Sequence, residues 1–174
     1  NEYELSSTST KLVVGHPVGE FYINRYAGVN PANGDALWLT KEGEVTTEFN
    51  ESDKVMIGKS YIAPWQGGFG TSLSWKGLTL SAQFAWVADR WMFNNDRFFE
   101  ESNGLYSVYN QSRRLLYDRW KKPGDVTDIP RYGVTPQMDS RFLEDASFLR
   151  LKNMMLSYSL PTNLLRKSNF FTSA

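Results

Sequence analysis

The strongest pattern in the sequence is an alternation of apolar and polar residues on both sides of a two-residue turn. Large apolar residues and threonine occupy every second position over residues 69–75, with glycine and serine between them. The alternation resumes after Lys76-Gly77 and continues over residues 78–86. A period of two places successive side chains on opposite faces of a strand, so the pattern predicts a β-hairpin over residues 65–88.

A two-residue turn also fixes which residues lie opposite one another in this hairpin. Each expected pair falls on the same, mostly apolar face, which makes the register self-consistent. The expected pairs are Trp75–Leu78, Leu73–Leu80, Thr71–Ala82 and Phe69–Phe84.

Charge is almost absent from this hairpin. Over residues 60–88 the single charged residue is Lys76, which lies in the turn. The wet face of a soluble hairpin usually carries lysine, glutamate or arginine, whereas this polar face is mainly glycine, serine, threonine and glutamine. A strand with one lipid-facing and one lumen-facing side has this pattern in an outer-membrane β-barrel. The same alternation also fits a core hairpin of a secreted, soluble β-sandwich that binds carbohydrate, which stays as the alternative.

The spacing of the aromatic residues supports the barrel. Trp65 and Trp75 are ten positions apart on one face. At about 3.3 Å per residue and a tilt of roughly 40°, that distance spans on the order of 25 Å, the height of the apolar band of a barrel. We therefore expect Trp65, Trp75, Trp86 and Tyr158 to form the aromatic girdles at the edges of this band.

A third strand is predicted over residues 148–160. Its large apolar residues fall on even positions from 154 to 160 but on odd positions at 149 and 151. This change of phase indicates a β-bulge near Lys152-Asn153, and Pro161 ends the strand. Residues 162–169 have the composition of a turn and residues 170–174 that of another strand, so we expect the chain to be a fragment.

Two long polar regions surround the predicted strands. Residues 89–147 contain half of the charged residues of the chain, and a helix is expected near residues 105–121. Residues 1–64 are expected to form short hairpins, with strands near 20–28 and 37–49. Because barrels have short periplasmic turns and long extracellular loops, Lys76-Gly77 and residues 162–169 are expected on the periplasmic side.

The expected fold is therefore all-β, part of a large transmembrane antiparallel β-barrel with long extracellular loops and one short loop helix. Residues 1–64 and 89–147 are its extracellular regions, and residues 65–88 are a transmembrane hairpin. Residues 148–174 comprise a transmembrane strand, a periplasmic turn and the start of the next strand. Together they make one incomplete barrel domain.

Composition excludes several function classes. The formal net charge is zero and there is no cysteine, so neither a nucleic-acid binder nor a thiolate metal site is expected. His16 is the one histidine, which leaves no histidine-based triad or metal cluster. Acidic pairs such as Glu100-Glu101 and Asp125 with Asp128 are interpreted as solvated loop residues. We expect no catalytic residue, no bound metal and no cofactor, and neither a signal peptide nor a membrane helix is predicted.

Four segments resemble the end region of SusC/RagA-type TonB-linked transporters. The most specific is Ser140-Arg141-Phe142-Leu143-Glu144-Asp145-Ala146-Ser147-Phe148-Leu149-Arg150-Leu151-Lys152-Asn153, which ends in residues 156–161. Residues 15–35, 57–69 and 118–131 are similar to further motifs of the family. The resemblance extends over nearly the whole chain.

This resemblance implies a barrel of about 22 strands with an internal plug, located in the bacterial outer membrane. It implies import of oligosaccharides or peptides, a SusD-like surface lipoprotein as a lid, and energy from TonB through a missing amino-terminal part. Candidate ligand- or lid-facing loop residues are Trp91, Tyr106, Asp125 and Arg131. Tyr109 and Trp120 are expected instead to pack within the loop.

Overall fold

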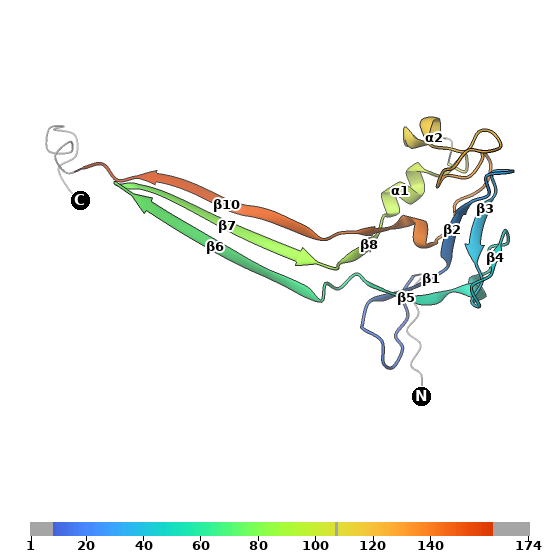
Figure 1. The fold of residues 1–174 in the computed structure, drawn as a ribbon, viewed down its shortest axis with the longest axis horizontal. Coiled ribbons are helices and arrows are strands. Elements are labelled where there is room, and N and C mark those ends of the chain that lie inside the picture. The colour runs from blue at the N-terminus through green and yellow to red at the C-terminus, as the bar shows by residue number, and fades with distance from the viewer. Residues whose placement is uncertain (1–8, 107, 162–174) are drawn as a thin grey trace. The chain divides into compact units, whose positions relative to one another are not determined.

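The computed structural model describes residues 9–106 and 108–161. The chain divides into two compact units, which are described separately. Residues 64–88 and 147–174 belong to the strand unit, and residues 1–63 and 89–146 belong to the loop unit. Most regular structure in both is β-strand (Figure 1), which confirms the predicted all-β class.

The strand unit is a three-stranded antiparallel sheet. It contains β6 (Trp65–Trp75), β7 (Leu78–Ala88) and β10 (Phe148–Tyr158), in the order β10-β7-β6. The three long strands run side by side in Figure 1. The pairing of β6 with β7 confirms the predicted register from Trp75–Leu78 through Phe69–Phe84.

Lys76 and Gly77 form the tight turn between β6 and β7. Both have positive φ, at 47° and 86°, which is the requirement of a type I′ turn and suits the twist of the flanking strands. Gly77 is also in close contact with the chain that follows β10. Ser159 donates its N–H to the Gly77 carbonyl at 2.8 Å, and a Cβ on Gly77 would lie 2.9 Å from the Ser159 carbonyl oxygen. The positive φ and the close Ser159 carbonyl therefore both disfavour a side chain at position 77.

The predicted β-bulge is confirmed. The register between β10 and β7 shifts between Leu151 and Asn153, which leaves Lys152 as the extra residue. Leu151 lies opposite Phe84, and Met154 lies opposite Ala82. Because directly opposed residues share a face, the bulge brings the odd and even apolar positions of β10 onto one side of the sheet.

The loop unit is built from short strands. β1 (Glu20–Ile23) pairs with β5 (Val55–Ser60), and β2 (Arg25–Val29) pairs with β3 (Ala36–Leu39). β3 also pairs with β4 (Val45–Thr46), which confirms the hairpin expected over residues 37–49. β8 (Trp91–Phe93) pairs with β9 (Leu143–Asp145). The remaining elements are η1 (Glu51–Asp53), α1 (Asn95–Glu100), α2 (Arg114–Tyr117) and η2 (Ser140–Phe142).

The core of the loop unit is small and lies between these strands. Phe21, Ile23 and Leu143 are its buried members, and Trp91 and Phe93 pack against it half-buried. Phe142 is fully buried, and its ring lies 5.8 Å from that of Phe93. With a core of this size, the long connections need polar contacts of their own to be held in place.

The helix expected near residues 105–121 was wrong. Among the described residues of that range the helical part is the single turn α2, and α1 lies earlier in the chain. Asn103 and Gly104 have positive φ, at 53° and 103°, and the Asn103 amide donates to the Arg131 carbonyl at 2.6 Å. Local bonds of this kind compete with helix formation. The apolar positions of the expected stripe are exposed, with Val108 at 87% and Tyr109 at 70%, so the packing role expected for Tyr109 was also wrong.

In the residues that the structure describes, no helix is long and apolar enough to cross a membrane. The expected turn over residues 162–169 and the strand start at 170–174 lie outside the described residues.

Candidate functional site

The apolar face of the three-stranded sheet is one candidate functional surface. No described residue of the strand unit covers its large side chains, and Trp65 and Trp75 are 67% and 71% exposed. Phe69 stacks on Phe84 with ring centroids 5.0 Å apart. A contiguous apolar surface of this kind marks contact with lipid or with another protein. Its other exposed members are Leu73, Leu78, Leu80, Leu149, Leu151, Met154, Leu156 and Tyr158.

The opposite face of β6 and β7 is small and polar. Ser72 and Ser81 are hydrogen-bonded through their hydroxyls at 3.0 Å, and Ser74 and Thr79 at 2.9 Å. These cross-strand pairs satisfy hydroxyls without introducing charge. One apolar and one polar face is the arrangement of a barrel wall between lipid and lumen.

The four predicted girdle residues lie toward the two ends of the apolar face. Trp75 and Tyr158 both lie opposite Leu78, at the turn end of the sheet. Trp65 begins β6 at the other end, and Trp86 lies opposite Gly67 two positions further along. A Cβ on Gly67 would lie 3.0 Å from the Trp86 Nε1 atom, so this glycine makes room for the indole. The placement is the one that girdles require, and the membrane role stays a prediction.

In the loop unit, the segment 139–142 is the point at which several strands meet. Asp139 caps the η2 turn by accepting the Arg141 N–H at 3.0 Å. Its other carboxylate oxygen accepts the Trp38 indole N–H at 2.8 Å. Burial raises the pKa of Asp139, while these bonds and the nearby Arg141 charge oppose the rise. Ser140 accepts the Tyr26 N–H at 2.9 Å, which attaches the same turn to β2.

A cluster of two arginines and two acids connects the helices to the long loop. Arg97 on α1 bonds Glu101 at 3.0 Å and Asp128 at 3.0 Å. Arg114 on α2 bonds the same two carboxylates, with Asp128 at 2.8 Å. Arg97 also reaches Glu144 at 3.2 Å. Each acid is thus shared by two guanidinium groups, and we call these four residues (Arg97, Glu101, Arg114 and Asp128) the arginine–carboxylate cluster.

In this cluster the charged forms of the acids and arginines stabilise one another and hold the loop in place. Burial alone would raise the pKa of Asp128, but hydrogen bonds and charge from Arg114, together with the Arg97 charge, lower it. For Arg114, burial opposes the charged form, and the bonds to Asp128 and Glu101 outweigh it and raise its pKa. Charged groups paired in this way are bound to each other rather than free for proton transfer. Among the described residues, no group of three or more His, Cys, Asp or Glu could hold a metal ion.

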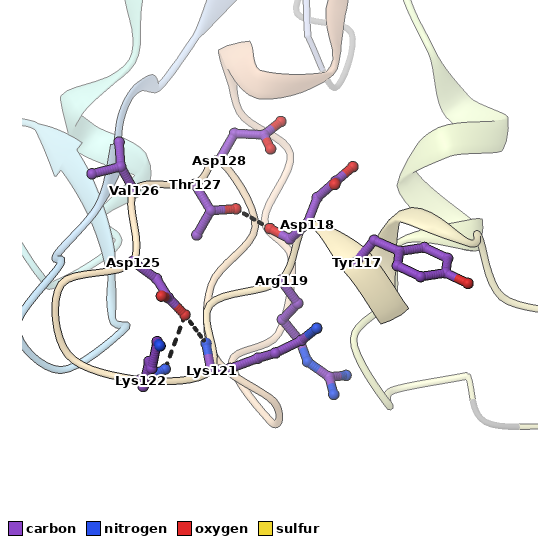
Figure 2. Close-up of a pocket in the computed structure, with 9 residues that line it drawn as sticks. All are labelled: Tyr117, Asp118, Arg119, Lys121, Lys122, Asp125, Val126, Thr127 and Asp128. Carbon is purple, nitrogen blue, oxygen red and sulfur yellow. Dashed lines mark hydrogen bonds between the residues drawn. The ribbon is translucent and has the colours of Figure 1, made fainter.

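The loop that carries Asp128 surrounds an open hollow of about 750 Å³ (Figure 2). Asp125 accepts the backbone N–H groups of Lys121 and Lys122 at 3.0 Å each. These bonds lower its pKa. Thr127 donates its hydroxyl to the Asp118 carbonyl across the hollow. The wall is therefore held by turn hydrogen bonds, with cationic and anionic groups side by side.

No family model matches the chain. A solved structure of the RagAB peptide importer in the "open-open" state is 39% identical with a TM-score of 0.84, covering 97% of this chain and 19% of its own. TonB-dependent receptor P39 of Formosa agariphila is 25% identical over 146 residues, which is 79% of this chain. TonB-dependent receptor P26 of the same organism is 26% identical and matches 91% of this chain.

The chain belongs to the SusC/RagA type of TonB-dependent transporters. It spans 13% and 17% of the length of the two Formosa receptors. As a member of this family it is a protein of the bacterial outer membrane. The soluble β-sandwich alternative is not favoured by these relatives.

Trp91 is the member of the predicted loop-facing set with the most tightly defined surroundings. It lies on β8, half-buried against the core, and pairs with Asp145. The Lys59 Nζ atom lies 3.2 Å from the centroid of its ring, and its indole N–H donates to Asp89 at 3.2 Å. One face of the ring and its N–H group are both engaged, which favours a packing role over ligand contact.

The other three predicted loop-facing residues each have different contacts. Tyr106 packs on Phe99 with centroids 5.5 Å apart. Asp125 lines the hollow of Figure 2, whereas Arg131 bonds Asp35 at 2.9 Å. The structure therefore does not bring them into one site.

Sequence reasoning missed the arginine–carboxylate cluster and a second, apolar hollow beside α2. The spacing of Arg97 and Glu101, four residues apart on one helical turn, is a signal that could have revealed part of the cluster. Trp120, which was expected to pack within the loop, does so. Its ring packs against Gly34, where an added Cβ would lie 2.4 Å away.

Proposed function

We propose that the chain is part of an outer-membrane importer of oligosaccharides or peptides that works with a SusD-like surface lipoprotein as its lid. The observation that carries the proposal is the 39% identity to the RagAB peptide importer over nearly the whole chain. The two-faced sheet supports it, because such a sheet is suited to a barrel wall. The RagAB likeness favours peptides over oligosaccharides as the first substrates to test.

The proposal assigns a membrane topology to the chain. Residues 65–88 and 148–161 cross the membrane, and Lys76-Gly77 faces the periplasm. Residues 1–64 and 89–147 are extracellular, where the loop unit contributes to ligand capture and lid contact. Trp65, Trp75, Trp86 and Tyr158 lie at the two lipid–water boundaries. TonB would act through a part of the transporter outside this sequence.

The proposal also assigns no catalytic role to the chain. Of the acidic pairs named in the sequence analysis, Glu101, Asp125 and Asp128 form structural contacts. Asp128 is bonded to two arginines, and Asp125 holds a turn. Groups with these partners would need to give up existing bonds to take part in a reaction.

Uptake by whole cells tests the importer proposal. A strain that lacks the complete transporter gene is compared with the same strain carrying it, and accumulation of labelled peptides and of labelled oligosaccharides is measured. We expect accumulation of at least one class to depend on the gene and on a functional TonB. Equal accumulation of every peptide and oligosaccharide in both strains would contradict the proposal.

The lid is tested separately. The affinity-tagged full transporter is purified from outer membranes, and its co-purifying proteins are identified by mass spectrometry. A SusD-like lipoprotein in stoichiometric amount is the expected result. A transporter that imports its substrate but purifies alone would remove the lid from the proposal and leave import intact.

A further inference from the structure

A second hollow of the loop unit has the character of a side-chain binding pocket. It has a volume of about 350 Å³ and is lined by α2 and by turns before and after it. Leu115 is buried and forms its floor, while Leu116 and Tyr132 are 64% and 65% exposed. A small apolar concavity with few polar groups is the usual form of a binding site for an apolar group. We call it the tyrosine hollow.

The walls of the tyrosine hollow are held in place by bonds formed without any ligand. The Gln111 amide accepts the Ser102 hydroxyl at 2.8 Å and donates to the Tyr106 carbonyl at 3.1 Å. The ring of Tyr132 lies against Gly104, where a Cβ would meet it at 2.9 Å. A preformed wall lowers the ordering cost of binding.

Two arginines at the tyrosine hollow lie over aromatic rings and not against carboxylates. The guanidinium of Arg113 lies over the Tyr117 ring at 5.4 Å, and that of Arg119 lies over the Tyr132 ring at 5.3 Å. Over residues 9–106 and 108–161, neither forms an ion pair with a carboxylate. No acid is among the described residues that line the hollow. Its charge is therefore positive, and a guanidinium fork held over an aromatic ring is ready to bind a carboxylate.

We propose that the tyrosine hollow is a peptide subsite that binds an apolar side chain, while Arg113 and Arg119 bind acidic groups beside it. The inference rests on the proposed import function and gives it a preference, namely for acidic peptides with an apolar residue. A sugar would present many hydroxyls to this hollow. The floor is leucine and the Gln111 amide is already bonded, so hydroxyls directed at the floor would lose water without gaining partners there.

Binding to the purified full transporter tests the preference. The probes are dye-labelled short peptides with Glu-Leu-Glu, Gln-Leu-Gln or Glu-Ser-Glu at the centre of a Gly-Ser background, followed by fluorescence polarisation. We expect Glu-Leu-Glu to bind about tenfold more tightly than either of the other two peptides. Raising the salt concentration should weaken its binding and leave that of Gln-Leu-Gln unchanged.

Variants with matched controls assign the effect to this hollow. Arg113→Gln with Arg119→Gln should remove the advantage of Glu-Leu-Glu over Gln-Leu-Gln, and Lys122→Gln, a basic change on the same loop, should retain it. Leu116→Ser should remove the advantage of Glu-Leu-Glu over Glu-Ser-Glu. Val126→Ser is its control, since Val126 is 95% exposed and lies outside the hollow.

Several results would overturn the inference. One is equal binding of the three peptides. Another is an Arg113→Gln and Arg119→Gln double variant that still prefers Glu-Leu-Glu over Gln-Leu-Gln, as the Lys122→Gln control does. Displacement of the probe by a uronate oligosaccharide would make the ligand an anionic sugar. A lowered melting temperature of the ligand-free double variant would mean that another segment of the transporter fills the hollow.

Cell uptake separates this inference from the import proposal. If the transporter imports both Glu-Leu-Glu and Gln-Leu-Gln equally well and binds them equally, only the subsite is refuted. If it binds Glu-Leu-Glu selectively but moves no peptide into the cell, only import is refuted.

Discussion

A single arginine at Thr71 tests the orientation of the strand unit. Thr71 lies on the apolar face opposite Ala82, so replacing it removes little packing. It is six residues from Trp65 and four from Trp75 on the same strand. At about 3.3 Å per residue and roughly 40° tilt, those separations are about 15 and 10 Å along the membrane normal. Thr71→Arg therefore places a charge in the interior of the proposed apolar band.

The expected cost follows from that depth. An arginine on the lipid face of a barrel costs about 2–4 kcal/mol near the midplane and about 0–1 kcal/mol near the interfaces. Such a cost lowers the ratio of folded to unfolded protein by a factor of about 30 to about 1,000. Thr71→Val, at the same site, should be close to neutral. Ser72→Arg, one position along on the other face, loses the hydroxyl bond to Ser81, about 1 kcal/mol at most for an exposed pair.

The assay compares the full-length variants in outer-membrane fractions. Folded barrel is quantified by its heat-modifiable mobility on gels, and the urea midpoint is measured by tryptophan fluorescence. We expect little folded Thr71→Arg protein and near-normal amounts of Thr71→Val and Ser72→Arg. Equal loss for both arginine variants, or greater loss for Ser72→Arg, would refute the assignment of the apolar face to lipid.

Three further predictions concern local structure. Gly34→Ala should destabilise the loop unit by about 1–3 kcal/mol, measured as faster limited proteolysis, because Gly34 has φ +79° and abuts the Trp120 ring; unchanged proteolysis would contradict this. Asp128 has a lowered pKa, so its contribution is present above its ordinary pKa near 3.9 and is lost as pH falls through the folded value. Asp128→Asn should therefore lower the thermal unfolding midpoint of the transporter at neutral pH and make that midpoint less dependent on acid pH. An unaltered dependence of the midpoint on pH would argue against the ion pairs of Asp128 with Arg97 and Arg114. Gly77→Ala should reduce the yield of folded barrel, since φ is +86° and the Ser159 carbonyl is too close for a Cβ; normal yield would mean that the turn has another conformation.

The strand unit could be predicted in detail from the sequence because its two faces have different surroundings. Alternation between Phe69 and Gly70, or Leu73 and Ser74, records that difference residue by residue. The bulge at Lys152 was visible for the same reason, since an extra residue reverses the parity of the apolar positions. Register and bulge thus need no information from distant parts of the chain.

The loop unit could not be predicted in this way. The apolar spacing of Val108 and Tyr109 suggested a helix face, yet both side chains are exposed. What determines the backbone there is a set of contacts with residues far along the chain, such as the bond from the Asn103 amide to the Arg131 carbonyl. Hydrophobic periodicity predicts secondary structure only where the pattern of burial determines which side chains are apolar. In this loop the backbone conformation depends on hydrogen bonds and ion pairs instead.

The segment that carried the strongest family resemblance has a physical reason to be distinctive. Asp139, which precedes this segment, and its first three residues, 140–142, contact several different parts of the loop unit. Substitution of these residues is therefore expected to loosen the attachments of the loop, whatever ligand the transporter binds. A motif of this kind identifies the family through the contacts that hold its loop together, and it says little about the substrate. Substrate preference has to be sought at side chains that are not bonded within the loop, such as those of the tyrosine hollow. The contacts are Asp139 with Trp38, Ser140 with Tyr26 and Asn24, Arg141 with the rings of Tyr26 and Phe142, and Phe142 with Phe93 and Phe98.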